Sequence, residues 1–212
     1  MDKNFVSAQL RNQFYQILKT QGFTQKADVF RQIDGEIIRI VDIQHSVKRH
    51  CFQVNLGIHL RPLGEYIMGC TGKPLVIEKM REYDCAWRNS ILPNLINDYD
   101  SDWLYGSNEQ EAIEMVQFLA SEWNRQSQIF FNALAHWPQD FIHQANLAVQ
   151  NPIHPMDMAK LCHVAAAAGN LDLVKTLAEL ALPAVPERAT SLKQKLESFM
   201  INPHLAIPNI SP

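Results

Sequence analysis

The stretch Cys51-Phe-Gln-Val-Asn-Leu-Gly-Ile-His-Leu60 alternates apolar and polar side chains almost without interruption. Such a two-residue period predicts a β-strand that buries one face and exposes the other. Two further strand-like runs precede it, Phe23–Ile33 and Glu36–Gln44, and Asp34-Gly35 stands between them as a hairpin signal. The three runs predict an antiparallel meander in which one face of the sheet carries polar residues.

A helix is predicted ahead of this sheet. Leu10, Phe14, Ile17 and Leu18 recur at the spacing of one helix face, and Gly22 follows at a position where helices commonly end. Since this apolar face needs a partner, we expect it to pack on the third strand. The expected cluster consists of Leu10, Phe14, Leu18, Val54, Leu56 and Ile58.

The pattern becomes less regular after the third strand. A fourth strand is predicted at Glu82–Ile91, where Tyr83, Cys85 and Trp87 alternate with other side chains. The intervening segment Arg61–Lys79 contains two prolines and three glycines. It predicts a long loop or lid, with a short strand at 75–77.

From Ser107 onward the apolar period becomes helical, and Ser107 with Gln110 resembles a helix-capping box. Further helical segments follow, and Gly169 is expected to divide two helices of a hairpin. The sequence therefore predicts an α+β fold. An N-terminal helix packs on an antiparallel meander sheet of about four strands, followed by an all-helical C-terminal half. The expected parts are 1–106, helix and sheet; 107–202, helical and packed on the sheet or a subdomain; and 203–212, a tail.

Composition excludes some classes of protein and favours others. The chain has 212 residues, of which 47% are hydrophobic, enough for a substantial core. Its 19 basic and 22 acidic residues are scattered, which argues against a nucleic-acid partner. The N-terminal residues do not resemble a signal peptide and no apolar run has the length of a membrane span, so we expect a cytoplasmic protein without a membrane partner. We expect free thiols at Cys51, Cys70, Cys85 and Cys162.

Three local motifs bear on cofactors, and none has the spacing of a known site. Gly69–Pro74 has proline where a phosphate-binding loop needs serine or threonine. The cluster of His45, His50, Cys51 and His59 lacks the paired spacing of zinc ligands. Neighbouring Cys162 and His163 point about 100° apart on a helix. We therefore expect no cofactor and no bound metal.

The polar face of the sheet is the predicted functional surface. Its side chains, with an acidic loop after the fourth strand, form either a partner-binding surface or a face that is merely solvated. The loop lacks the glycine and terminal glutamate of a calcium loop. The candidate partner-binding residues are Arg31, Gln44, Gln53, Asn55, His59, Arg88, Asp98, Asp100 and Asp102.

The first 125 residues or so contain an ordered set of short motifs. They are Gly22-Phe23, Phe30-Arg31, Val41-Asp-Ile-Gln44, Phe52-Gln-Val-Asn-Leu-Gly-Ile58, Asp84-Cys-Ala-Trp-Arg88 and Asp102-Trp103. In these motifs the chain resembles a bacterial family of domains of unknown function, the one numbered 4304. The resemblance implies a helix packed on an antiparallel sheet, and it implies no activity or catalytic residue.

Two functional hypotheses follow. The first is a non-catalytic bacterial interaction protein, most concretely an immunity protein that binds and neutralises a cognate toxin, where an acidic surface would attract a basic partner. The alternative is an enzyme or small-anion-binding protein that uses the polar sheet face, with Arg31, His59 and Arg88 around the anion and the 61–79 loop as a lid. The sequence leaves the oligomeric state open.

Overall fold

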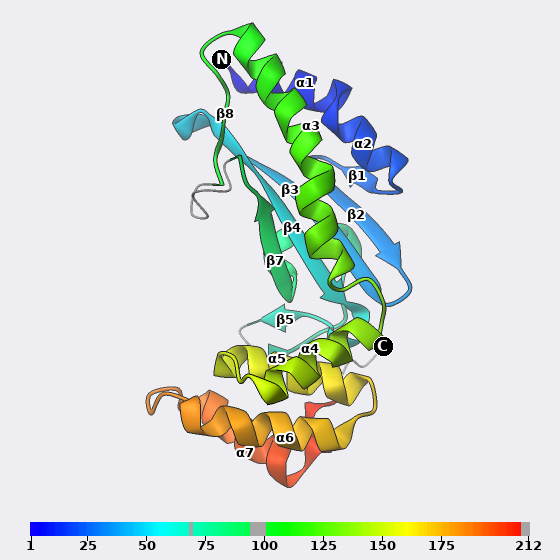
Figure 1. The fold of residues 1–212 in the computed structure, drawn as a ribbon, viewed down its shortest axis with the longest axis vertical. Helices are drawn as coiled ribbons and strands as arrows, with labels where there is room; N and C mark the ends of the chain where they lie inside the picture. The colour runs from blue at the N-terminus through cyan, green and yellow to red at the C-terminus, as the bar shows by residue number, and fades with distance from the viewer. Residues whose placement is uncertain (68–69, 94–100, 209–212) are drawn as a thin grey trace. The chain divides into compact units, whose positions relative to one another are not determined.

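The computed structural model describes residues 1–67, 70–93 and 101–208 (Figure 1). These residues form two compact units, each with its own apolar core. Unit 1 contains residues 1–59 and 78–133, and unit 2 contains residues 60–77 and 134–212. The predicted α+β class is confirmed, while the predicted domain boundaries stay a prediction. Among the described helices, none is long and apolar enough to cross a membrane.

Unit 1 is built on an antiparallel sheet with more strands than the four predicted. The order is β1-β2-β3-β4-β7, and β8 pairs with β4 beyond the end of β7. The bounds are β1 Thr24–Lys26, β2 Val29–Asp34, β3 Ile37–Ser46, β4 Cys51–Leu60, β7 Trp87–Ile91 and β8 Trp103–Leu104.

The predicted hairpin between the first two runs is confirmed, since Asp34 pairs with Ile37 across a tight turn. The single strand predicted at 23–33 is wrong. It is divided into β1 and β2 by a turn at Ala27 and Asp28, where Ala27 has φ +55°. A residue with positive φ cannot continue a strand, so the chain reverses there.

Two predictions for the segment between β4 and β7 are also wrong. The predicted fourth strand begins only at Trp87, because residues 82–84 form the 3₁₀ turn η4 (Glu82–Asp84). No strand occupies 75–77, where the 3₁₀ turn η3 (Ile77–Lys79) begins. This segment has no repeating apolar pattern, so its conformation depends on tertiary contacts.

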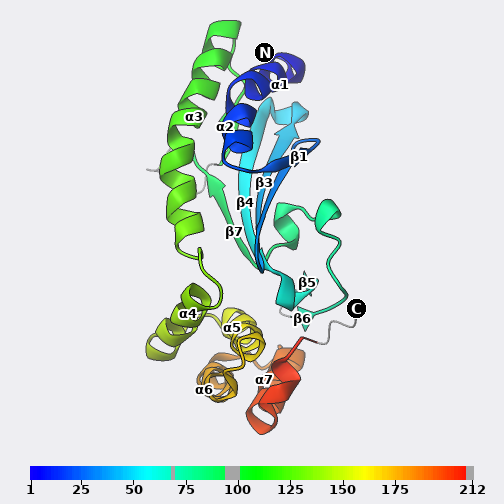
Figure 2. The same cartoon turned by 90° about the vertical axis from the view of Figure 1, so that its right-hand side faces the viewer.

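The predicted N-terminal helix is two helices, α1 (Lys3–Asn12) and α2 (Phe14–Thr20), with a break at Gln13. The third helix, α3 (Glu109–Asn132), starts one residue later than predicted, because the Asn108 side chain caps it by accepting from Glu111 N. Figure 2 shows α1, α2 and α3 on one face of the sheet. The Gln126 amide fixes α3 to the sheet edge by bonding both N and O of Leu92 at 2.8 Å.

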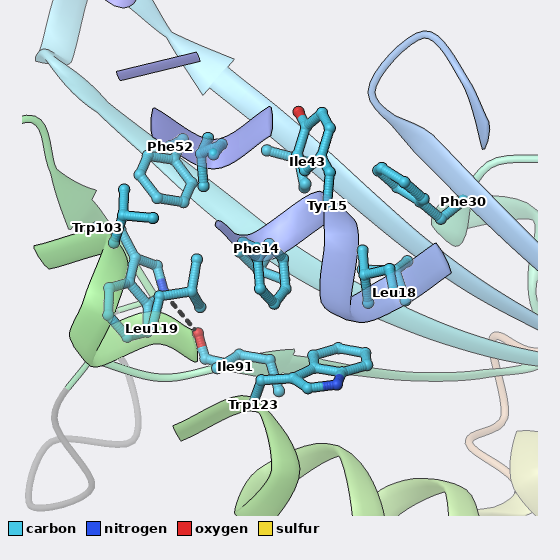
Figure 3. Close-up of a cluster of buried hydrophobic side chains, with 14 of the residues drawn as sticks. Phe14, Tyr15, Leu18, Phe30, Ile43, Phe52, Ile91, Trp103, Leu119 and Trp123 are labelled. Carbon is cyan, nitrogen blue, oxygen red and sulfur yellow. Dashed lines mark hydrogen bonds between the residues drawn. The ribbon is translucent and has the colours of Figure 1, made fainter. Parts of the chain in front are cut away.

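The core of unit 1 lies between these helices and the sheet (Figure 3). Phe14 meets Trp123 edge to face at 5.4 Å, and Trp103 Nε1 donates to the Ile91 carbonyl at 2.9 Å. The predicted packing of the first helix on the third strand is confirmed for most of its members. Leu10, Phe14, Leu18, Val54 and Leu56 share one cluster, and Ile58 is buried outside it.

Unit 2 is mainly helical and carries the predicted helical hairpin around Gly169. Its helices are α4 Gln139–Gln150, α5 Pro155–Ala167, α6 Leu171–Ala181 and α7 Thr190–Ile201, and a small hairpin pairs β5 (Tyr66–Ile67) with β6 (Cys70–Thr71). The predicted tail is folded at its start. Pro203 and Ala206 of the 3₁₀ turn η6 (Pro203–Ala206) are buried, and His163 Nδ1 donates to the Ala206 carbonyl at 2.6 Å.

Candidate functional site

The sheet face opposite the helices carries an ion pair whose carboxylate is buried. Asp42 of β3 is fully buried, and Arg81 donates to its two oxygens from Nε at 2.8 Å and Nη2 at 2.6 Å. These hydrogen bonds raise the pKa of Arg81, so the guanidinium stays charged. Because a buried carboxylate is costly without such a partner, Arg81 is required to hold Asp42 in place.

Arg31 lies beside this pair and is buried as well, with 8% exposed. Its Nη2 donates to the Met80 carbonyl at 2.5 Å. Burial lowers the pKa of Arg31, and the Asp42 carboxylate opposes that change. Arg31 and Arg81 together attach the segment from Met80 onward to the sheet face that the sequence predicted to be open.

The same segment covers the middle of β4. His59 is fully buried, with its Nδ1 accepting from Ala86 N at 3.2 Å. Gly57 packs so closely on Cys85 that an added Cβ would stand 2.5 Å from the Cys85 sulfur. Asn55 is 7% exposed and accepts from Ser90 Oγ at 2.8 Å. The prediction of an exposed polar face is therefore wrong at Arg31, Asn55 and His59, which are buried and each make a hydrogen bond inside the protein.

Two predicted site residues do meet at the surface. Gln53 Nε2 donates to Asp102 Oδ1 and to Ser101 Oγ, both at 2.9 Å. Arg49 Nη1 donates to the other Asp102 oxygen at 2.5 Å, although Arg49 itself is mostly exposed. Asp102 is thus held by side chains from two directions at the start of β8.

The other predicted residues are dispersed. Gln44 lies near the Asp42 pair, with Nε2 3.3 Å from Asp42 Oδ2. Arg88 is exposed, 3.8 Å from Glu82. Asp98 and Asp100 lie outside the described residues.

A groove of 650 Å³ lies beside the Gln53–Asp102 contact, between β8 and the start of α3. Leu104 is 66% exposed and Phe118 is 48% exposed, while the Trp103 ring lies 5.9 Å from that of Phe118. Met115 also lines the groove, and Arg49, Asp102 and Glu111 are its charged members. Exposed apolar side chains enclosed by polar ones are typical of binding surfaces.

The backbone of β8 adds hydrogen-bonding groups to this groove. Tyr105 N donates to the His50 carbonyl at 2.9 Å, so this residue bonds toward β4. In an antiparallel strand, the backbone N–H and C=O groups of successive residues point to opposite sides. Leu104, which is paired with Cys51, therefore directs its N–H and C=O away from β4. Within the described part of the chain, those two groups have no hydrogen-bond partner.

Carboxylates predominate around the groove. Two carboxylates, Asp102 and Glu111, line it against one guanidinium, Arg49, and the Met1 amino group donates to the Gly106 carbonyl. Hydrogen bonds from Ser107 and Asn108 lower the pKa of Glu111 and keep it ionised.

Sequence reasoning missed Asp42, Arg81, Leu104 and Phe118. An aspartate inside the β-branched run 36–44 was a usable signal, because a buried strand accepts a carboxylate only with a cation beside it. Leu104 and Phe118 carried no such signal, since a single apolar residue is ordinarily assigned to the core.

Two other observations limit the chemistry. Burial raises the pKa of the Cys85 thiol and raises that of Cys162 to about 12, so neither is a ready nucleophile. Within the described ranges, no three His, Cys, Asp or Glu side chains are grouped as metal ligands would be.

Residues 14–113 match the model of the family described as a domain of unknown function, DUF4304. The resemblance predicted for the N-terminal part of the chain is therefore confirmed. The matched range contains every described strand of the unit 1 sheet, and both Asp102 and Leu104. No curated protein and no solved structure matches the chain.

Proposed function

We propose that this protein is a non-catalytic interaction protein that binds a protein partner at the groove between β8 and α3. The observation that carries the proposal is Leu104. Its side chain is exposed, its backbone N–H and C=O are directed outward, and Phe118 lines the same groove. A strand edge next to an apolar groove offers both main-chain pairing and a side-chain pocket.

The chemistry of the groove favours one kind of occupant, an extended segment of another protein. Its main chain pairs with Leu104 while one of its apolar side chains contacts Phe118 and Met115. Because carboxylates outnumber cations here, the segment carries basic residues beside its apolar one. Charge attraction would mainly speed association, and the apolar contact would mainly slow dissociation.

The more specific form of the proposal is an immunity protein that neutralises a cognate toxin in the bacterial cytoplasm. It is supported by the acidic groove, which suits a basic toxin such as a nuclease, and by the internally paired polar groups of the sheet face. A toxin is neutralised by binding alone, so this role needs no reacting group in the protein.

Co-expression tests both levels of the proposal. A toxic protein encoded next to this gene is produced with the wild-type chain or with a Leu104→Asp, Phe118→Asp double variant. We expect the wild type to restore growth and to copurify with the toxin. The double variant should weaken binding at least tenfold, since charged groups replace apolar contacts. Ile129→Asp is the matched control, because Ile129 is a 71% exposed apolar residue of α3 outside the groove.

The outcomes separate the two levels. If the double variant binds a purified partner as tightly as the Ile129→Asp control does, the groove is not the interface. If the groove variant loses a partner that is not toxic, the immunity role is wrong while protein binding at the groove stands.

The alternative function on the sheet face has less support. Its three residues serve separate contacts: Arg31 with Met80, His59 with Ala86, and Arg88 near Glu82. Two of them are buried, so a ligand reaches them only if the covering segment moves away.

A further inference from the structure

A second hollow of unit 1 shares no lining residue with the protein-binding groove, although its His45 bonds Tyr105 of the groove at 2.8 Å. Its volume is 380 Å³, and it opens where the β1–β2 turn passes the end of α1 and strand β3. Nothing in the proposed function uses it. Its polar and aromatic lining consists of Lys3, Asp28, Gln44, His45, Arg81 and Tyr83.

Arg81 is fixed at the wall of this pocket. Its Nε and Nη2 are held by Asp42, and its guanidinium carbon lies 5.9 Å from the centre of the Tyr83 ring. Among the described residues, Nη1 has no hydrogen-bond partner. A guanidinium held by a buried carboxylate and an aromatic ring loses little freedom when it binds an anion, which favours binding.

A second cation stands at the same pocket. Lys3 is exposed in the first turn of α1, and no ion pair engages it within the described part of the chain. The carboxylate of Asp28 also lines the pocket, and its Oδ1 accepts a hydrogen bond from the Tyr15 hydroxyl at 2.9 Å. Burial lowers the pKa of His45 and the Lys3 charge lowers it further, a larger effect than the opposing one of Asp28. The pocket lining thus holds two cations, Lys3 and Arg81, against one carboxylate, Asp28, while Asp42 is paired with Arg81.

The turn between β1 and β2, which lines the pocket, is strained. Ala27 lines the pocket with φ +55°, a conformation that alanine rarely adopts. Such strain persists where the surrounding structure imposes it, and it is enriched at ligand-binding sites. Here the strained residue is part of the pocket lining.

We propose that this pocket binds a small molecule through an oxyanion group, a carboxylate or a phosphate. Arg81 Nη1 and Lys3 Nζ donate to the oxyanion, and the Tyr83 ring, which is 58% exposed, packs against the rest of the molecule. A volume of 380 Å³ suits a small metabolite.

Titration of the full chain with inorganic phosphate, and separately with acetate, tests the proposal at constant ionic strength. Backbone amide NMR signals of Gln44, His45 and Arg81 should shift and saturate with at least one of the two anions. Lys3→Gln should weaken binding roughly tenfold, because it removes one of two charges near the anion. Lys19→Gln is the matched control, since Lys19 is an exposed lysine of α2 outside the pocket.

Arg81 itself is a poor choice for substitution, because its loss leaves Asp42 buried without a partner. Saturation with phosphate alone assigns a phosphate ligand, and saturation with acetate alone assigns a carboxylate. The proposal is overturned if neither anion gives saturable shifts at these signals, or if Lys3→Gln and Lys19→Gln bind equally well.

Discussion

The single residue Ala27 marks the point where the chain reverses between β1 and β2. It holds φ +55° in the two-residue turn between β1 and β2, where an L-residue is disfavoured by about 1–2 kcal/mol. Ala27→Gly should relieve that strain. Because glycine also gives the unfolded chain more conformational entropy, the net gain in stability should be at most about 1 kcal/mol. Urea unfolding measures the change. Ala120→Gly within α3 is the control and should destabilise by about 1 kcal/mol; a similar loss for both variants would contradict the strained turn.

His45 predicts how stability depends on pH. Its Nδ1 lies 2.8 Å from the Tyr105 hydroxyl, and burial lowers its pKa from the ordinary value of 6.5. Above pH 6.5 the imidazole is neutral whether the chain is folded or unfolded. As the pH falls below 6.5, the unfolded chain takes up a proton that the folded protein does not. Stability should therefore decrease through this window and level off below the folded pKa.

Urea midpoints measured from about pH 7.5 to pH 5 test this dependence. His45→Gln should flatten the curve in that range, because no imidazole remains at position 45 to titrate. His50→Asn is the control and should keep the wild-type slope, since asparagine tolerates the φ of +49° at that position. A curve for His45→Gln as steep as that of the wild type would show that another group causes the loss.

Strand β4 is the element whose sequence pattern predicted the structure best. Leu56 lies at its middle and is only 1% exposed, within the cluster of Phe14 and Trp123. Leu56→Ala should cost about 2–5 kcal/mol, because it removes buried apolar atoms and leaves a cavity. Val47→Ala, at a 59% exposed site in the same unit, is the matched control and should cost little. A loss below about 1 kcal/mol at Leu56 would mean that β4 has another register.

The same strand shows why the polar face was misassigned. Alternation distinguishes the face of Val54 and Leu56 from that of Asn55 and His59, but it does not distinguish a polar side chain in water from one paired inside the protein. The cover is the segment 78–86, which has no apolar period and is attached through Arg31, Arg81 and backbone groups. Those contacts join residues 27 to 49 positions apart, and a local pattern carries no information about them.

In the molecule as a whole, the helical period predicted where the helices lie in the sequence. It did not predict which of the two cores each helix joins. Both α3 and α6 have one apolar face, yet α3 contributes Trp123 to the unit 1 core whereas α6 contributes Leu177 to the unit 2 core. An apolar helix face indicates only that the helix packs against some other surface. Choosing between two available cores depends on the lengths and directions of the connections, which the sequence pattern does not specify.

The existence of two separate cores leads to a prediction about cooperativity. Cys51 and Cys85 are buried in unit 1, and Cys162 is buried in unit 2. Buried thiols react only after the surrounding structure opens, so each cysteine reports the opening of its own unit. In a Cys70→Ser background, pulse labelling along a urea gradient with peptide mass spectrometry should give one midpoint shared by Cys51 and Cys85. Cys162 should have a different midpoint, because its core contains none of the residues that stabilise the sheet. Labelling of all three at a single midpoint would instead establish that the two units unfold together.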